Sequence, residues 1–180
     1  MRDLLRMTTV LFITCGLSAG SLAVMNAVTR ERIATSEQRQ RDAALREVFT
    51  DADEFRTVTP DKVWGAARNG QDIGYVFQVK TQGYSGPISL VVGTDLAGAI
   101  RGVRILSQTE TPGLGAKIAT AGFRDQFNKK RRQEIALKKD DAANGRIDAI
   151  TGATISSRAV TEAISSTLES FEKEKAGGDK

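Results

Sequence analysis

A short segment near the C-terminus, residues 148–154, combines residue types that suit a phosphate group. Its sequence is Asp-Ala-Ile-Thr-Gly-Ala-Thr, and an amphipathic helix is predicted to begin after it, from about Ser157. Gly152 and Ala153 let a bulky group approach the backbone closely. Thr154 would lie ahead of the helix, whose free N–H groups and positive dipole end favour a phosphate. The alternative is a loop that only caps the helix, in which the first amides are bonded by the hydroxyl groups of Thr154, Ser156 or Ser157.

A second glycine-containing segment lies upstream at residues 110–115, with the sequence Glu-Thr-Pro-Gly-Leu-Gly. Pro-Gly is by itself a common turn signal. A glycine turn at residues 83–86, Gly-Tyr-Ser-Gly, precedes it and leads into alternating apolar residues from Ile88 to Val92. Because glycine allows close approach to the backbone, the loop at residues 110–115 could meet a ligand through its main-chain N–H groups.

These three segments, in this order, resemble the FMN-binding domain of the G subunit of the Rnf electron-transport complex and of its relative, the C subunit of the sodium-pumping NADH:quinone reductase. The resemblance covers roughly residues 60–170, and the short chain favours the Rnf protein. It implies that FMN is attached covalently, through its phosphate, to the hydroxyl of Thr154. The modifying enzyme that it implies is a flavin transferase of the ApbE type, which takes FMN from FAD with a divalent cation.

The resemblance also implies which residues surround the flavin. Thr151, Gly152 and Ala153 flank the attachment residue, and Asp148 is expected to serve recognition by the modifying enzyme. The remaining expected contacts come from the upstream segments, namely Glu110, Thr111, Gly113, Leu114, Gly115, Lys117, Tyr84 and Ser85. The glycines admit backbone N–H groups to the polar edge of the ring, and Leu114 packs on its face. For Glu110 and Lys117, a solvated pair beside a turn is the alternative.

The composition excludes several kinds of chemistry. The chain of 180 residues has no histidine, which excludes His-based triads, His-ligated metals and haem held by axial histidines. Its one cysteine, Cys15, cannot form a disulfide within the chain, an iron–sulfur cluster or a CxxC site. Redox chemistry must therefore belong to an organic cofactor, and we assign neither a catalytic side chain nor a metal ligand.

Binding of nucleic acid is not expected. The formal net charge of +4 is mild and is spread along the chain. The dense basic run at residues 129–132 has few aromatic neighbours, which is typical of a solvated helix end or loop.

Residues 7–29 contain no charged side chain and are predicted to form a transmembrane helix. As a helix, this length spans a hydrocarbon core of about 30 Å. The alternative is a cleaved signal peptide, since Arg2 and Arg6 form a basic start and small residues follow the apolar run. We favour a retained anchor, because the uncharged run is longer than the usual apolar part of a signal peptide.

The anchor is expected to place residues 1–6 in the cytoplasm and the flavin domain on the periplasmic side of the bacterial inner membrane. Arginines after the span outnumber those before it, so a simple positive-inside count would point the domain inward. That count applies best to short loops, and the resemblance implies an extracytoplasmic flavin domain. Residues 30–55 are expected to continue as a stalk helix, residues 56–175 to form the FMN-binding domain, and residues 176–180 to be a disordered tail.

Alternating apolar residues predict an antiparallel sheet. Residues 73–79 alternate as a half-buried strand should, residues 88–92 repeat the pattern, and a third run contains Val103 and Ile105. Asn69-Gly70 is a strong hairpin signal ahead of the first of these runs. Short turns between the strands favour neighbours that pair in an antiparallel way.

Helices are predicted at residues 116–127 and 157–171, where they would cover the sheet. The second carries an apolar stripe typical of core packing, formed by Val160, Ile164, Leu168 and Phe171. The expected fold is therefore α+β, with an N-terminal transmembrane helix followed by a small FMN-binding domain whose antiparallel sheet is covered by helices.

The predicted function is that of a membrane-anchored electron-transfer subunit with covalent FMN, part of an ion-translocating Rnf-type ferredoxin:NAD oxidoreductase and not an enzyme by itself. Its partners would be the other membrane and redox subunits of that complex and the flavin transferase. One alternative is the equivalent C subunit of a sodium-pumping quinone reductase, and another is a stand-alone extracytoplasmic flavin carrier. An alternative of a different class is a membrane-tethered binding module without redox function.

Overall fold

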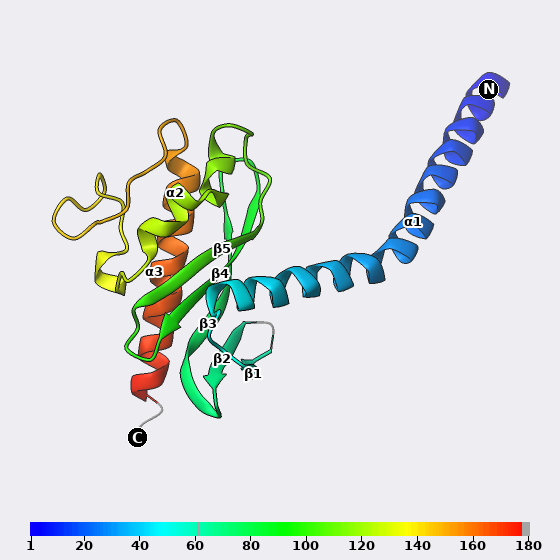
Figure 1. The fold of residues 1–180 in the computed structure, drawn as a ribbon. Coiled ribbons are helices and arrows are strands. Elements are labelled where there is room, and N and C mark those ends of the chain that lie inside the picture. Colours follow the sequence, from blue (N-terminus) through cyan, green and yellow to red (C-terminus); the bar gives the residue numbers. More distant parts are fainter. Residues whose placement is uncertain (61, 178–180) are drawn as a thin grey trace. The chain divides into compact units, whose positions relative to one another are not determined.

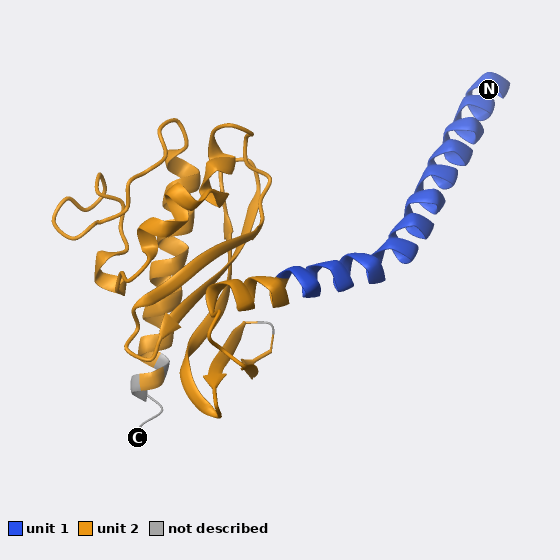
Figure 2. Ribbon diagram, in the orientation of Figure 1, with its two compact units in different colours: residues 1–40 blue, residues 41–180 orange. Residues whose placement is uncertain are grey.

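The structure is a computed structural model that describes residues 1–60 and 62–177. It divides into two compact units, residues 1–40 and residues 41–180 (Figure 2). The first helix, α1 (Arg2–Val48), contributes to both units. By length and composition α1 is able to cross a membrane, in agreement with the predicted N-terminal span.

The end of α1 is part of the domain core. We expected a stalk helix over residues 30–55, but α1 ends at Val48 and strand β1 (Glu54–Thr59) has begun before residue 55. Leu45 and Phe49 are buried against the sheet. The expectation was wrong because the partners of these apolar residues come from strands further along the chain, which local composition does not reveal.

Five antiparallel strands form one sheet in chain order, from β1 to β5 (Figure 1). The strands that follow β1 are β2 (Val63–Arg68), β3 (Gln71–Gln82), β4 (Pro87–Asp95) and β5 (Ile100–Ser107). The predicted turn at Asn69-Gly70 is confirmed, since both residues have positive φ, 51° and 78°, as a two-residue hairpin requires. The three predicted strands lie within β3, β4 and β5, whereas β1 and β2 were not predicted as strands.

Both faces of the sheet are covered, which the half-buried alternation did not predict. On one face, Phe77 and Leu90 belong to the main core together with α3 (Thr154–Gly177). On the other face, Val76 and Val91 pack with Phe49 and its neighbours at the end of α1. In the middle of the sheet, the strands therefore carry apolar side chains on both faces.

Two glycines make room for the Phe49 ring. A Cβ at Gly74 of β3 would lie 2.6 Å from Phe49 Cζ, and one at Gly93 of β4 would lie 2.7 Å from Phe49 Cε2. Real Cβ atoms do not approach neighbours so closely, so a side chain at either position would displace the ring. Gly93 pairs with Val76 across the two strands, which places the hollow at the centre of the sheet.

Helix α3 covers the other face of the sheet (Figure 1). Its predicted stripe is confirmed as core packing, because Val160, Ile164 and Leu168 are buried and Phe171 is partly buried. The Phe171 ring lies with its centroid 4.8 Å from those of Tyr75 and Phe77. The helix begins at Thr154, earlier than the expected start near Ser157.

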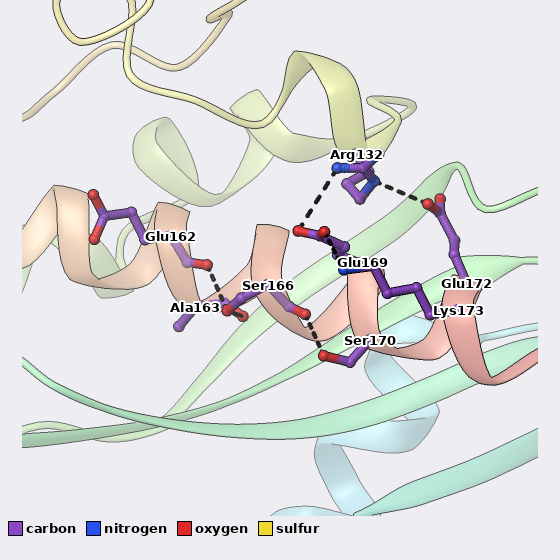
Figure 3. A network of polar contacts seen from close by, with 8 residues as sticks. All are labelled: Arg132, Glu162, Ala163, Ser166, Glu169, Ser170, Glu172 and Lys173. Atoms are coloured by element: carbon purple, nitrogen blue, oxygen red, sulfur yellow. Dashed lines mark hydrogen bonds and ion pairs between the residues drawn. The ribbon is translucent and has the colours of Figure 1, made fainter.

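The C-terminal half of α3 is also held by ion pairs (Figure 3). Arg132, in the short 3-10 helix η3 (Arg132–Glu134), places its Nε 2.9 Å from Glu172 Oε2 and its Nη1 3.9 Å from Glu169 Oε2. Lys173 pairs with the same Glu169 at 2.7 Å. These contacts are exposed, so each contributes little stability, and they mainly align η3 with the helix.

The helix continues further toward the C-terminus than expected. It extends to Gly177, whereas a disordered tail was expected over residues 176–180. Residues 178–180 of that expected tail lie outside the described residues.

The helix predicted at residues 116–127 is broken into three short pieces, η1 (Gly115–Ala119), α2 (Ala121–Arg124) and η2 (Asp125–Phe127). The break lies at Thr120, which is extended at φ −77° and ψ 152°. Its hydroxyl donates to the Lys117 carbonyl at 2.7 Å, a local bond that competes with helix continuation. The break lets Ile118, Phe123 and Phe127 all enter the core.

Candidate functional site

The phosphate-suited segment leads directly into α3. Gly152 has φ +78°, a left-handed conformation that favours glycine. The Ala153 N–H donates to the Ile150 carbonyl at 2.9 Å. The buried Ser157 hydroxyl accepts from the Ile150 N–H at 3.0 Å and donates to the Ala153 carbonyl at 2.9 Å. These bonds fix the turn, so that Thr154 is the first residue of the helix with its side chain half-buried.

The Thr154 hydroxyl has a cation as its neighbour. Lys139 Nζ donates to Thr154 Oγ1 at 2.7 Å. The first amides of α3 have no acceptor within the helix, and their partial positive charge adds to that of the ammonium group. The capping alternative required bonds to those amides, but the Ser157 hydroxyl bonds the preceding loop and the Ser156 hydroxyl donates to Glu110 Oε2 at 2.5 Å. Thr154 Oγ1 therefore lies beside two sources of positive charge, the Lys139 ammonium group and the N-terminus of α3.

Glu110 is buried at the centre of the site, with 4% of its surface exposed. Its Oε1 accepts from the Ser85 N–H at 3.0 Å, and its Oε2 accepts the bond from the Ser156 hydroxyl. A Cβ at Gly115 would lie only 2.6 Å from Oε2, so this position needs glycine. The carboxylate thereby joins the turn at residues 83–86, the loop at residues 110–115 and the first turn of α3.

The alternative of a solvated pair between Glu110 and Lys117 is wrong. Lys117 is exposed, whereas Glu110 is buried, so the two do not form a pair in solvent. Among the residues that the structure describes, no ion pair joins the two, and the Lys117 carbonyl accepts from the Thr120 N–H and hydroxyl.

A groove of about 520 Å³ opens beside these groups. Its lining comes from all three segments and consists of Tyr84, Glu110, Thr111, Leu114, Gly115, Gly152, Ala153, Thr154, Ile155 and Ser156. Three apolar side chains in this lining are unusually exposed, Tyr84 at 70%, Leu114 at 45% and Ile155 at 52%. The groove thus has a polar end at Thr154, whose hydroxyl contacts Lys139, a buried acidic side chain at Glu110, and exposed apolar side chains elsewhere.

Four residues expected at the site lie beside the groove and do not line it. Ser85 is linked to the lining through Glu110 and through a 3.4 Å contact between its hydroxyl and that of Thr111. Gly113 has φ +78° at the tip of its loop, with open space around the position of a Cβ. The remaining two are Lys117 and Thr151, which are both exposed.

Asp148 has partners inside the domain. Its carboxylate pairs with Lys138 Nζ at 2.7 Å, and its N–H donates to Gln126 Oε1 at 2.7 Å. The side chain nevertheless remains 65% exposed. It is therefore accessible to another protein, but it also holds the start of the phosphate-suited segment.

An ion pair crosses from the loop before this segment to α3. Asp140 accepts from Arg158 Nε at 2.8 Å and from Arg158 Nη2 at 2.7 Å. This bidentate bond holds the pKa of the Asp140 carboxyl below its usual value, and the same bond raises the pKa of Arg158. Within residues 1–60 and 62–177, no group of three or more His, Cys, Asp or Glu side chains could hold a metal ion.

Three residues of the site were not predicted as ligand contacts, namely Lys139, Ile155 and Ser156. Ile155 and Ser156 follow Thr154 directly and would have been included had the helix start been placed correctly. Lys139 is distant in sequence and reaches Thr154 only because the loop folds back. Nothing in the sequence distinguishes Lys139 from the other basic residues.

The chain is similar to known proteins over most of its length. Residues 83–169 match the family described as the FMN-binding domain, a range that includes all three segments. The chain is 36% identical over 160 residues to the G subunit of the proton-translocating ferredoxin:NAD(+) oxidoreductase complex of Clostridium ljungdahlii, with 88% of this chain and 86% of that protein covered. It is 31% identical over 185 residues to the G subunit of the Na(+)-translocating ferredoxin:NAD(+) oxidoreductase complex of Acetobacterium woodii, with 91% and 89% covered.

Among solved structures, the fold is similar to the crystal structure of the C subunit of the Na(+)-translocating NADH-quinone reductase from Parabacteroides distasonis. The TM-score is 0.53 and the sequence identity is 28%. The match covers 62% of this chain and 60% of that chain.

Proposed function

We propose that this chain is a membrane-anchored electron-transfer subunit that holds FMN on Thr154. The chain belongs to the family of G subunits of ion-translocating ferredoxin:NAD oxidoreductase complexes. The observation that carries the proposal is the position of Thr154. It is the first residue of α3, its hydroxyl contacts Lys139, and it opens into a groove with exposed apolar walls.

The residues of the groove fit FMN. The phosphate would be held where the free amides of α3 and the Lys139 ammonium group gather positive charge beside Thr154. The isoalloxazine would pack against the exposed apolar side chains of Tyr84, Leu114 and Ile155, and this contact would remove their apolar surface from water. Gly152 keeps the backbone accessible next to the attachment residue.

The hydroxyl of Thr154 would supply the nucleophile for covalent attachment. Thr154 Oγ1 forms a bond to the phosphorus of the FMN half of FAD, the pyrophosphate bond to AMP breaks, and the hydroxyl proton is released to solvent. FAD and a flavin transferase of the ApbE type with a divalent cation supply this reaction. The ester retains the cofactor in an open extracytoplasmic space.

The cofactor itself supplies the chemistry of accepting and donating electrons. The protein binds and orients it and covers part of its surface. Glu110 contributes indirectly, since it joins the three segments that form the groove through its bonds to Ser85 and Ser156. A protein of this kind relays electrons between other redox subunits and is not an enzyme by itself.

Assignment as a G subunit is preferred to assignment as a quinone-reductase C subunit. The two ferredoxin:NAD oxidoreductase relatives are 36% and 31% identical to this chain along 86% and 89% of their own length, whereas the solved quinone-reductase structure is 28% identical. The other membrane and redox subunits of a ferredoxin:NAD oxidoreductase complex are therefore the proposed partners of this chain.

The anchor is proposed to place residues 1–6 in the cytoplasm and the flavin domain outside. The supporting observation is that α1 contains the uncharged span and is able to cross a membrane. Alkaline phosphatase fused after Lys180 should then be active, because that enzyme folds only outside the cytoplasm. A silent phosphatase together with an active cytoplasmic reporter at the same junction would overturn this orientation.

Thr154→Val tests the attachment site. Valine keeps the branched shape and lacks the oxygen that forms the ester, and Thr151→Val is the matched control in the same segment. After coexpression with the transferase, the wild-type chain should gain the mass of FMN less water and fluoresce on a denaturing gel, and Thr151→Val should keep at least part of this label. Thr154→Val should remain unlabelled. Label on Thr154→Val, or none on the wild-type chain beside an active transferase, would refute covalent attachment at this residue.

A further inference from the structure

Three consecutive residues of one loop each contact the region around Thr154. Lys138 Nζ lies 2.7 Å from Asp148 Oδ2, and Lys139 Nζ lies 2.7 Å from Thr154 Oγ1. Asp140, the third, forms the bidentate bond to Arg158. The loop thus contacts the segment before α3, the first residue of α3 and the next turn of α3 in sequence.

The two lysines differ in what they contact. Lys138 pairs with a carboxylate, so its charge is neutralised locally. The side-chain contact of Lys139 is with a neutral hydroxyl, and the described residues provide no ion pair within 4 Å for it, while the neighbouring Asp140, which interacts with its charge, is itself bonded to Arg158. Its ammonium group therefore keeps a positive charge that an anion at Thr154 could neutralise, and it is already within hydrogen-bond distance of the oxygen that would carry that anion.

The backbone holds Lys139 in this position. The Lys138 N–H donates to the Ile147 carbonyl at 3.0 Å, and the Asp140 N–H donates to the Leu137 carbonyl at 2.9 Å. Leu137 and Ile147 are both buried in the main core. The bond between Asp140 and Arg158 fixes the other side of Lys139, since Arg158 lies one helical turn after Thr154.

We infer that Lys139 is the phosphate-binding cation of the attachment site, and that Asp140 and Arg158 position it. The inference depends on the proposed attachment of FMN to Thr154. Lys139 would attract the phosphoryl group of FAD while the bond from Thr154 Oγ1 to phosphorus forms and the bond to AMP breaks. It would then neutralise the remaining negative charge of the phosphodiester.

The test is the rate of labelling of the full chain by FAD and the transferase, followed by intact mass. Lys139→Met keeps the length of the side chain and removes the charge, and Lys138→Met does the same to the neighbour that faces Asp148. Lys139→Met should be labelled about tenfold or more slowly than wild type, because a charge-assisted bond in the reacting complex is lost. Lys138→Met should stay within about twofold of the wild-type rate, and Lys139→Arg should recover most of that rate, because the positive charge is kept.

A second measurement separates a contact with the phosphate from recognition by the transferase. Protein labelled to completion by long incubation is compared by phosphorus NMR. The resonance of the ester should move in Lys139→Met and stay in place in Lys138→Met, because Lys139 contacts the attachment oxygen and Lys138 contacts Asp148 instead.

The outcomes are distinct. Wild-type labelling speed in Lys139→Met, equal slowing by Lys138→Met, or an unmoved phosphorus resonance would each overturn the role of Lys139 while leaving attachment at Thr154 intact. A wild-type chain that never acquires flavin would overturn the attachment itself and this inference with it.

Discussion

Replacing Glu110 by alanine should destabilise the folded domain, because this residue joins the segments that form the groove. Both oxygens of this buried carboxylate accept bonds, one from the Ser85 amide and one from the Ser156 hydroxyl. Alanine removes both acceptors. Ser85 is exposed, so its amide can form a hydrogen bond with water instead. Ser156 is 1% exposed, so its hydroxyl would lose its hydrogen-bond partner inside the protein.

The expected loss in the free energy of unfolding is about 2–4 kcal/mol. A hydrogen bond to a charged group contributes about 1.5–3 kcal/mol, and the buried bond from Ser156 counts most fully. Hydration of the Ser85 amide and the removal of a buried charge offset part of the loss. A loss of about 3 kcal/mol lowers the melting temperature of a domain of this size by roughly 10 °C.

Glu110→Gln is the matched control. Its amide oxygen can still accept from Ser85, and its amide N–H can donate to the Ser156 oxygen, so the shape and both contacts survive without the charge. The loss should be about 1 kcal/mol.

Thermal unfolding of the unlabelled full chain in detergent, followed by circular dichroism, measures all three proteins. The expected order of melting temperatures is wild type, then Glu110→Gln, then Glu110→Ala. An alanine variant within about 1 °C of wild type would refute the joining role of the carboxylate. A glutamine variant as unstable as the alanine variant would show that charge, and not the pair of bonds, holds the site.

Two further predictions concern the rim of the groove and the loop beside it. Gly113→Val should strain the loop, because φ is +78° at this position, although the surrounding space is open. The flavin should stay attached, but its absorption spectrum or midpoint potential should shift. An unchanged spectrum and potential would count against a contact between the loop and the flavin ring. Arg158→Gln should raise the pKa of Asp140 toward its usual value, which a carbon NMR titration of the carboxyl group can follow. A lowered carboxyl pKa stabilises the folded state at pH values above the usual pKa, and this contribution is lost as the pH falls through the lowered value. Wild type should therefore be more stable than Arg158→Gln at neutral pH and equally stable in acid. A difference in stability that persists in acid would contradict the ion pair.

The parts of the fold that local patterns control were predicted from the sequence. The Asn69-Gly70 hairpin depends on two adjacent residues that tolerate positive φ, and the stripe from Val160 to Phe171 depends on helical spacing within one element. The break at Thr120 was missed because apolar spacing alone suits either a helix or a series of short turns. The burial of Phe49 was missed because its hollow is made by glycines of two distant strands.

The site was predicted as three segments without the contacts that join them. Motifs identify residues by type and order, so the segments around Thr154 and Glu110 were found. Glu110 was assigned to the ring or to solvent because nothing near it in sequence indicates burial, and its partners Ser85 and Ser156 lie far apart in the chain. Lys139 was missed for the same reason, since only the folded loop brings it to Thr154.

The hollow that receives Phe49 limits how this protein could be recombined with others. The composition changes near residue 30, where an exchange of anchors between proteins would look natural, yet the last turns of α1 and Phe49 complete the second face of the sheet. A crossover before Arg41 transfers an intact domain, whereas one after Phe49 transfers a sheet with an empty hollow beside Gly74 and Gly93. A segment that is exchanged as an intact flavin domain must therefore include the end of α1.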